Sequence, residues 1–140
     1  MSSVPDPMTW SWPAEAGSVS TARHTVVEWL RGYSLSDPPL SDVALLVSEA
    51  VTNAVRHAYV GRPAPGTIDV TVTAGQDEVL VTIQDTGNGL RPRPDSPGLG
   101  YGLALMVAVS ERLEAQSAEN QGTRLRAWFR RDPSVGAPAD

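Results

Sequence analysis

The chain has 140 residues, of which 41% are hydrophobic, and a formal net charge of -5. This length favours one domain with a single two-layer core. Cysteine is absent, which excludes disulfide frameworks, thiolate metal sites and cysteine nucleophiles. All eleven basic residues are arginine, so a Walker-type phosphate loop has no lysine to use. The acidic balance argues against a sequence-independent nucleic-acid binder.

Targeting signals are not evident in this sequence. The opening residues, MSSVPDPMTWSWPAEAG, carry acids and prolines where a secretory signal needs positive charge followed by an apolar run. No apolar stretch approaches the roughly 20 residues that a membrane span requires. We therefore expect a cytoplasmic protein that does not contact a membrane.

Hydrophobic periodicity predicts one strand and two helices in the first half of the chain. Residues 8–12 alternate large apolar and small hydroxyl side chains, which is typical of a half-buried edge strand. Helical spacing of apolar residues follows over 18–31. After the turn signal Asp37-Pro38-Pro39, the alanine, leucine and valine content of 43–58 predicts a second helix.

The second half of the chain is richer in β-branched runs. Residues 67–74 and 79–84 predict a central antiparallel hairpin. A stretch rich in glycine and proline follows, and helical spacing resumes over 101–112. Residues 113–117 and 123–129 predict the last two strands.

This order of elements predicts an α+β fold, a two-layer sandwich with the helices gathered on one face of a mostly antiparallel sheet. We expect a single domain over residues 8–131. It would lie between a flexible N-terminus, residues 1–7, and a flexible tail, residues 132–140.

Three segments carry candidate chemistry, and the first lies on the predicted second helix. Glu49 and Asn53 are four residues apart, and Arg56 continues the same helical stripe. Asn53 can offer an uncharged oxygen to Mg²⁺ while Glu49 orients an attacking hydroxyl group. The alternative interpretation is a solvated polar stripe on an amphipathic helix.

The second segment, Asp85-Thr86-Gly87-Asn88-Gly89, directly follows a predicted strand. A carboxylate at a strand end is suited to accept the exocyclic amine of adenine. Glycines at alternate positions let the backbone pass close beneath a flat ligand. The alternative is an ordinary β-turn, because aspartate, asparagine and glycine dominate turns.

The third segment, Gly98-Leu99-Gly100-Tyr101-Gly102-Leu103, opens the predicted third helix. The backbone N–H groups of such a loop, with a helix N-terminus behind them, favour phosphate oxygens. A dinucleotide-binding fingerprint is one alternative, but its spacing differs and a strand would precede it. A purely structural glycine loop is the other.

Taken in order, SEAVTNAVRHAY, QDTGNGL and GLGYGLALM, followed by Gly122-Thr123, resemble the GHKL (Bergerat-fold) ATPase superfamily of gyrase-type ATPases and histidine kinases. The small size, the lack of dimerisation and phosphoacceptor helices, and the residues of EAVTNAVRHAY are most similar to the anti-sigma-factor serine/threonine kinases. The resemblance covers residues 8–130 approximately, and it implies the histidine-kinase-type ATPase fold.

The resemblance also implies a role for each matching residue. Glu49 would be the catalytic base, Asn53 the Mg²⁺ ligand and Asp85 the adenine ligand, with Thr123 supporting adenine through water. Arg23 matches the arginine with which such kinases grip a sigma factor. The other residues implied to bind ATP are Gly87, Gly89, Gly98, Leu99, Gly100, Tyr101, Gly102 and Leu103.

The activity implied is that of a transcription regulator that binds ATP and Mg²⁺ and transfers the γ-phosphate to a serine of a partner. The implied partners are an anti-sigma-factor antagonist as phosphoacceptor, a sigma factor and a second copy of the chain, without direct contact to nucleic acid.

The predicted ATP lid departs from the pattern of these kinases, because only residues 90–97 lie between Gly89 and Gly98. Arg91 and Arg93 are candidate phosphate clamps in this short lid, and the alternative, which the neighbouring prolines suggest, is a short, stiff, solvated loop. With a shorter lid, whether the lid closes over the phosphates is an open question. Two alternatives therefore stand beside the kinase: a nucleotide-dependent protein-binding module with little or no transfer, and an ATPase domain detached from a histidine-kinase system.

Overall fold

The structure is a computed structural model that describes residues 6–64, 66–88, 98–118 and 121–131. Within these ranges one antiparallel sheet has the strand order β1-β2-β3-β5-β4. Its strands are β1 (Met8–Pro13), β2 (Thr67–Ala74), β3 (Glu78–Asp85), β4 (Arg112–Ala118) and β5 (Gly122–Arg130).

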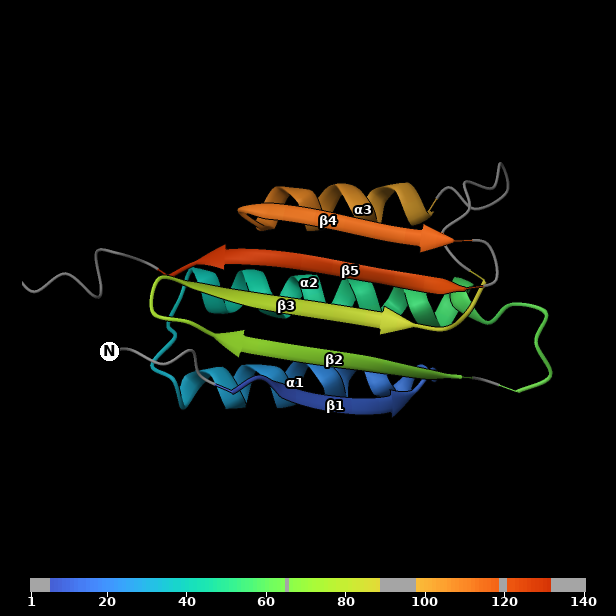
Figure 1. Cartoon of the computed structure of the whole chain (residues 1–140), viewed down its shortest axis with the longest axis horizontal. Coiled ribbons are helices and arrows are strands. Elements are labelled where there is room, and N and C mark those ends of the chain that lie inside the picture. The colour runs from blue at the N-terminus through green and yellow to red at the C-terminus, as the bar shows by residue number, and fades with distance from the viewer. Residues whose placement is uncertain (1–5, 65, 89–97, 119–120, 132–140) are drawn as a thin grey trace, which may run out of the picture.

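Three helices, α1 (Gly17–Arg31), α2 (Pro39–Asn53) and α3 (Gly98–Val109), lie on one side of the sheet (Figure 1). A π-helical turn, η1 (Ala54–Ala58), continues α2. The predicted α+β sandwich with its helices on one face is confirmed. None of the helices in the described ranges is long and apolar enough to cross a membrane.

The core lies between the sheet and the helices. β2 and β3 bury every second residue, as their alternating sequence predicts. On α1, Ala22, Val26 and Leu30 are fully buried at helical spacing. On α2, Val47 and Val51 are equally buried, on the side opposite the predicted polar stripe.

The predicted extents of two helices were wrong. α2 begins at Pro39 rather than residue 43, because proline suits the first helical turn, where no backbone donor is needed. Its last predicted turn is π-helical rather than α-helical. α3 begins at Gly98, within the predicted glycine loop, and ends at Val109, so that Arg112 opens β4. Packing against α2 outweighs the poor helix propensity of these glycines.

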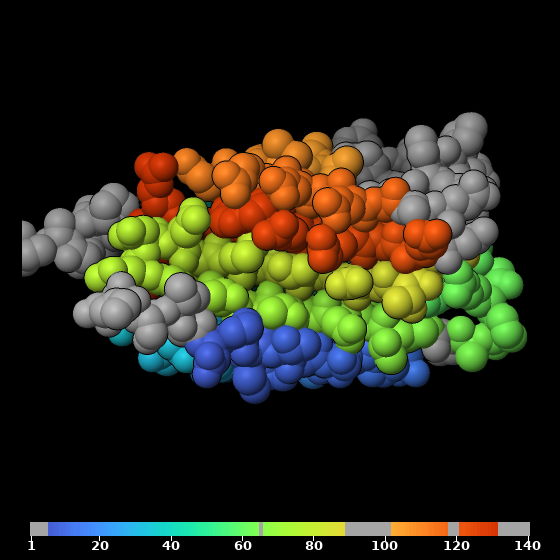
Figure 2. All heavy atoms as spheres, in the orientation of Figure 1, coloured from blue at the N-terminus to red at the C-terminus, as the bar shows by residue number. Residues whose placement is uncertain are grey.

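The other side of the sheet shows strand residues with no described helix over them (Figure 2). Trp128 projects from this side and is nevertheless only 8% exposed. The guanidinium carbons of Arg112 and Arg126 lie 3.9 and 5.1 Å from its ring centroid. Cation–π contacts and the aliphatic stems of the two arginines therefore take the place of a second layer over this ring.

We expect Arg112→Gln to lower the free energy of unfolding by about 1 kcal/mol, because it removes the closer cation–π contact from Trp128. Arg124→Gln is the matched control, since Arg124 lies on the same face and hydrogen-bonds Gln116 at 2.9 Å. The control should change the unfolding free energy by less than about 0.5 kcal/mol. Urea denaturation measures both, and equal losses would contradict the role given to the ring contact.

Candidate functional site

The predicted site residues come from segments that meet at one end of the sandwich. β3 ends here, β5 and α3 begin here, and α2 passes into η1 here, at the right of Figure 1. Because β3 and β5 are antiparallel neighbours, Asp85 stands opposite Thr123 in the register. Residues that are far apart in the sequence are therefore brought to one edge of the fold.

Glu49 and Asn53 are partly buried and face α3. A Cβ atom placed on Gly102 would lie 3.0 Å from Asn53 Nδ2, 3.2 Å from Asn53 Oδ1 and 3.3 Å from Glu49 Oε2. The structure thus brings the predicted base and the predicted metal ligand together against a glycine of the third segment. Arg56 is exposed and lies within the π-helical turn η1, whose angular spacing differs from that of the α-helix assumed for the stripe.

We expect Gly102→Ala to weaken Mg-ATP binding about tenfold, because the new methyl group would force the Asn53 amide to shift. Gly17→Ala is the matched control, since nothing lies within 4 Å of a Cβ atom there. Alanine is the better helix former, so neither variant should melt at a lower temperature through loss of helix propensity. Titration calorimetry with ATP compares the two, and unchanged affinity for Gly102→Ala would contradict the assignment.

Asp85 is a nearly buried carboxylate, 9% exposed, at the end of β3. Its Oδ1 accepts a hydrogen bond of 2.9 Å from the Gly87 backbone N–H. Burial raises the pKa of Asp85 above 3.8, while backbone hydrogen bonds from Gly87 and Thr123 and the charge of Arg62 act to lower this pKa. Backbone N–H groups therefore hold the carboxylate in a poorly hydrated position, where it can still accept a hydrogen bond from an amine.

Two glycines allow the backbone to close around this carboxylate. A Cβ atom on Gly87 would lie 2.0 Å from the Ala58 carbonyl oxygen. Gly122 has a φ of +90°, and its Cβ atom would lie 2.1 Å from the Asp85 carbonyl oxygen. Neither position accepts a side chain, so the segment after Asp85 is more tightly constrained than an ordinary surface turn.

Thr123 follows Gly122 and is only 8% exposed. Its Oγ1 lies 3.3 Å from Ser117 Oγ on β4. The structure thereby places the hydroxyl group that the resemblance assigns to adenine support at the edge where Asp85 lies.

The third segment is placed differently from the prediction. Gly98–Gly100 are not a loop before a helix but the start of α3, with Gly102 buried and Leu103 36% exposed. Gly89 and the predicted lid, residues 90–97 with both of its arginines, lie outside the described residues.

Arg23 lies on α1 and is exposed. Its Nη1 donates a hydrogen bond of 3.2 Å to Ser48 Oγ on α2. The predicted partner-contact arginine thus reaches the residue beside Glu49. Sequence reasoning missed this contact, because the spacing within one helix carries no information about which residues of another helix lie opposite.

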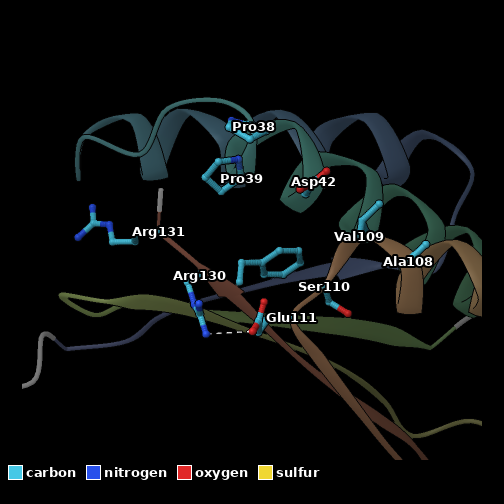
Figure 3. Close-up of a pocket in the computed structure, with 10 residues that line it drawn as sticks. Pro38, Pro39, Asp42, Ala108, Val109, Ser110, Glu111, Arg130 and Arg131 are labelled. Atoms are coloured by element: carbon cyan, nitrogen blue, oxygen red, sulfur yellow. Dashed lines mark hydrogen bonds and ion pairs between the residues drawn. The ribbon is translucent and has the colours of Figure 1, made fainter. Parts of the chain in front are cut away.

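A pocket of about 310 Å³ lies at the opposite end of α2, between its first turn and the connection from α3 to β4 (Figure 3). Pro39, Asp42, Ser110 and Glu111 are among its lining residues, and Glu111 Oε1 accepts a hydrogen bond of 3.1 Å from Arg130 Nη2. No residue of the three predicted segments lines this pocket. The candidate site is therefore assigned to the other end, where the chemistry-bearing residues converge.

Residues 12–129 match the histidine kinase-like ATPase domain family, and the chain belongs to this family. The chain is similar to an anti-sigma F factor of Clostridium botulinum, with 28% identity over 130 residues that cover 85% of this chain and 90% of the relative. An anti-sigma F factor of Bacillus cytotoxicus is 29% identical over 129 residues, which cover 84% and 88% of the two chains.

The fold is similar to a crystal structure of the RsbU and RsbW domains of a Mycobacterium tuberculosis protein, with a TM-score of 0.71 and 23% identity. The match covers 91% of this chain and 32% of that one, so this chain spans about a third of its length. The predicted membership of the GHKL superfamily, within its anti-sigma-factor-like branch, is confirmed by the sequence matches, and with it the prediction of a nucleotide-binding domain.

Proposed function

We propose that the protein is an ATP-dependent serine/threonine kinase of the anti-sigma-factor type, which transfers the γ-phosphate to a serine of an antagonist protein. The proposal rests on one observation: the Glu49 and Asn53 side chains both lie against Gly102, at the same end of the sandwich as Asp85. Similarity to anti-sigma F factors supports the class of partner. A sigma factor as second partner, contacted through Arg23, a homodimeric state and a cytoplasmic location are parts of this proposal.

Adenine would bind beside Asp85, whose carboxylate accepts a hydrogen bond from the exocyclic amine. Burial strengthens that bond, because little water competes for the carboxylate. Thr123 would contribute its hydroxyl through a water molecule. Because the Ala58 backbone fills the space where a side chain of Gly87 would lie, glycine here lets the loop after Asp85 pack directly against η1 and holds it beside the proposed adenine site.

The phosphates would lie toward α3. Its first turn supplies backbone N–H groups that have no partner within the helix, and the helix dipole favours negative charge there. The start of α3 at Gly98 thus supports the phosphate role proposed for Gly98, Leu99, Gly100, Tyr101, Gly102 and Leu103.

Asn53 would hold Mg²⁺ through its amide oxygen. The described residues contain no group of three or more histidine or acidic side chains that could hold a metal ion by themselves. One uncharged oxygen fits Mg²⁺, which is commonly bound by one or two protein groups together with substrate phosphates and water. When bound, the ion neutralises negative charge on the phosphates.

Glu49 would accept the proton of the partner's serine as the serine oxygen attacks the γ-phosphorus. The new bond joins the serine oxygen to phosphorus, and the bond from phosphorus to the oxygen of the ADP leaving group breaks. Glu49 is held one turn before Asn53 on the same helix, and both face Gly102. The base and the phosphate would therefore share one rigid element, which favours in-line positioning.

The proposal is tested by incubating the protein with γ-labelled ATP and a candidate antagonist domain, and by locating the label. Label on a serine of the antagonist, lost when that serine is replaced by alanine, is the expected result. Label on a histidine would indicate a detached histidine-kinase ATPase domain. ATP binding without transfer would indicate a nucleotide-dependent binding module, which the short lid of residues 90–97 favours.

A further inference from the structure

The side chain of Tyr59, just after η1, joins three segments of the site end. Its hydroxyl group donates a hydrogen bond of 2.6 Å to the Thr67 carbonyl oxygen at the start of β2. The same oxygen accepts a hydrogen bond of 3.0 Å from the backbone N–H of Thr86. Because Thr86 directly follows Asp85, this hydroxyl group fixes the chain next to the buried carboxylate.

The Tyr59 ring is itself held in place. A Cβ atom on Gly66 would lie 2.2 Å from Tyr59 Cε1, so the backbone of Gly66 lies directly against the ring. The guanidinium carbon of Arg62 lies 5.9 Å from the ring centroid. Arg62 Nε also donates a hydrogen bond of 3.2 Å to Asn88 Oδ1. The ring has little freedom to carry its hydroxyl group elsewhere.

Asn88 holds the other end of the same loop against the end of η1 and the residues that follow it. Its backbone N–H donates to the Ala58 carbonyl oxygen at 2.6 Å, and its Nδ2 donates to the Val60 carbonyl oxygen at 2.8 Å. The last carbonyl groups of a helix lack partners within it, and here the loop supplies them. Thr86 and Asn88 are thus both anchored, while Gly87 between them donates to Asp85.

We infer that Tyr59 is a positioning residue for adenine recognition, holding the base-binding loop Thr86–Asn88 so that the Asp85 carboxylate is presented to the base. The inference rests on the proposed nucleotide site and adds to it a residue that need not contact the nucleotide. Glu49 and Asn53 lie on α2, before η1, so the effect of Tyr59 falls on the base rather than on the phosphates.

Tyr59→Phe keeps the ring against Gly66 and removes only the hydroxyl group. We expect its affinity for ATP to fall about 3- to 10-fold, the loss that corresponds to one hydrogen bond, with a smaller preference for ATP over GTP. Affinity for inorganic tripolyphosphate, which has no base, should stay unchanged. Asn88→Ala, which removes the donor to Val60 without adding a charge, should show the same pattern.

Tyr33→Phe is the matched control, because Tyr33 lies beyond the end of α1 with its ring 4.5 Å from that of Trp29. Its affinities for ATP and tripolyphosphate should equal those of the wild type. Unchanged ATP affinity in Tyr59→Phe, or equal losses for ATP and tripolyphosphate, would overturn the positioning role. A wild-type protein that binds tripolyphosphate but not ATP would overturn the adenine site itself, and one that binds neither would overturn the proposed function.

Discussion

The Glu49→Gln variant is expected to transfer phosphate to its partner about 100- to 10,000-fold more slowly than the wild type, the range that a general base contributes. Glutamine has the shape of glutamate and can keep its place against Gly102, but its amide does not accept the serine proton. Affinity for ATP should therefore stay within about threefold of the wild-type value, because the side chain orients the attacking hydroxyl group and does not hold the nucleotide.

Single-turnover transfer of labelled phosphate and titration calorimetry measure these two quantities separately. Glu28→Gln is the matched control, since Glu28 is an exposed residue of α1 that forms an ion pair with Arg31. This control should transfer phosphate at the wild-type rate. Transfer at the wild-type rate by Glu49→Gln would contradict the role of Glu49 as general base. A parallel loss of ATP binding would show that Glu49 holds the nucleotide instead.

Asp85→Asn is expected to weaken ATP binding about 10- to 150-fold, the range for a hydrogen bond to a charged group. Asparagine loses the charge, and its amide nitrogen would face one of the backbone donors, Gly87 or Thr123, that now serve the carboxylate. Asp69→Asn is the matched control, because Asp69 is exposed on β2 and accepts a bond from Ser11. Equal ATP affinity of the two variants would contradict adenine binding by Asp85.

The raised pKa of Asp85 also predicts how the free energy of unfolding and the affinity for ATP change with pH. The folded state binds the Asp85 proton more tightly than the unfolded state, in which the pKa of this group is near 3.8. The contribution of Asp85 to the free energy of unfolding is therefore full below 3.8 and is lost as the pH rises through the raised folded-state pKa. ATP affinity has the opposite dependence, because the ionised form accepts the amine. The affinity for ATP should fall as the pH is lowered through the raised folded-state pKa toward 3.8, and the Asp85→Asn variant should not show this fall.

Most of the fold followed from periodicity. The β2–β3 hairpin alternates buried and more exposed residues along its length, and α1 repeats its buried residues at helical spacing. β5 alternates from Thr123 to Ala127 and then buries Trp128 and Phe129 as well. The predictions for residues 54–58 and for the start of α3 were wrong because tertiary packing determines both features. A π-helical turn is hydrogen-bonded five residues apart, and no residue type marks it in the sequence.

The residues of the candidate site could be named from the sequence, but their arrangement could not. Glu49, Asn53 and Asp85 were candidates because their residue types fit the chemistry and their motifs resemble those of the GHKL superfamily. That Gly102 would lie against the first two required the packing of α3 on α2. The anchoring of Thr86 by Tyr59 was also missed, because it acts through backbone groups that every residue possesses.

The proposed function requires that the three segments form one ATP site at the end of the sandwich where β3 ends. Amide chemical shifts recorded during titration with a non-hydrolysable ATP analogue and Mg²⁺ locate the bound nucleotide residue by residue. We predict saturable shift changes at Asn53, Gly87, Gly102 and Thr123, with the pocket around Glu111 unchanged. Changes confined to the pocket, with those four amides unaffected, would show that the three segments do not form the ATP site.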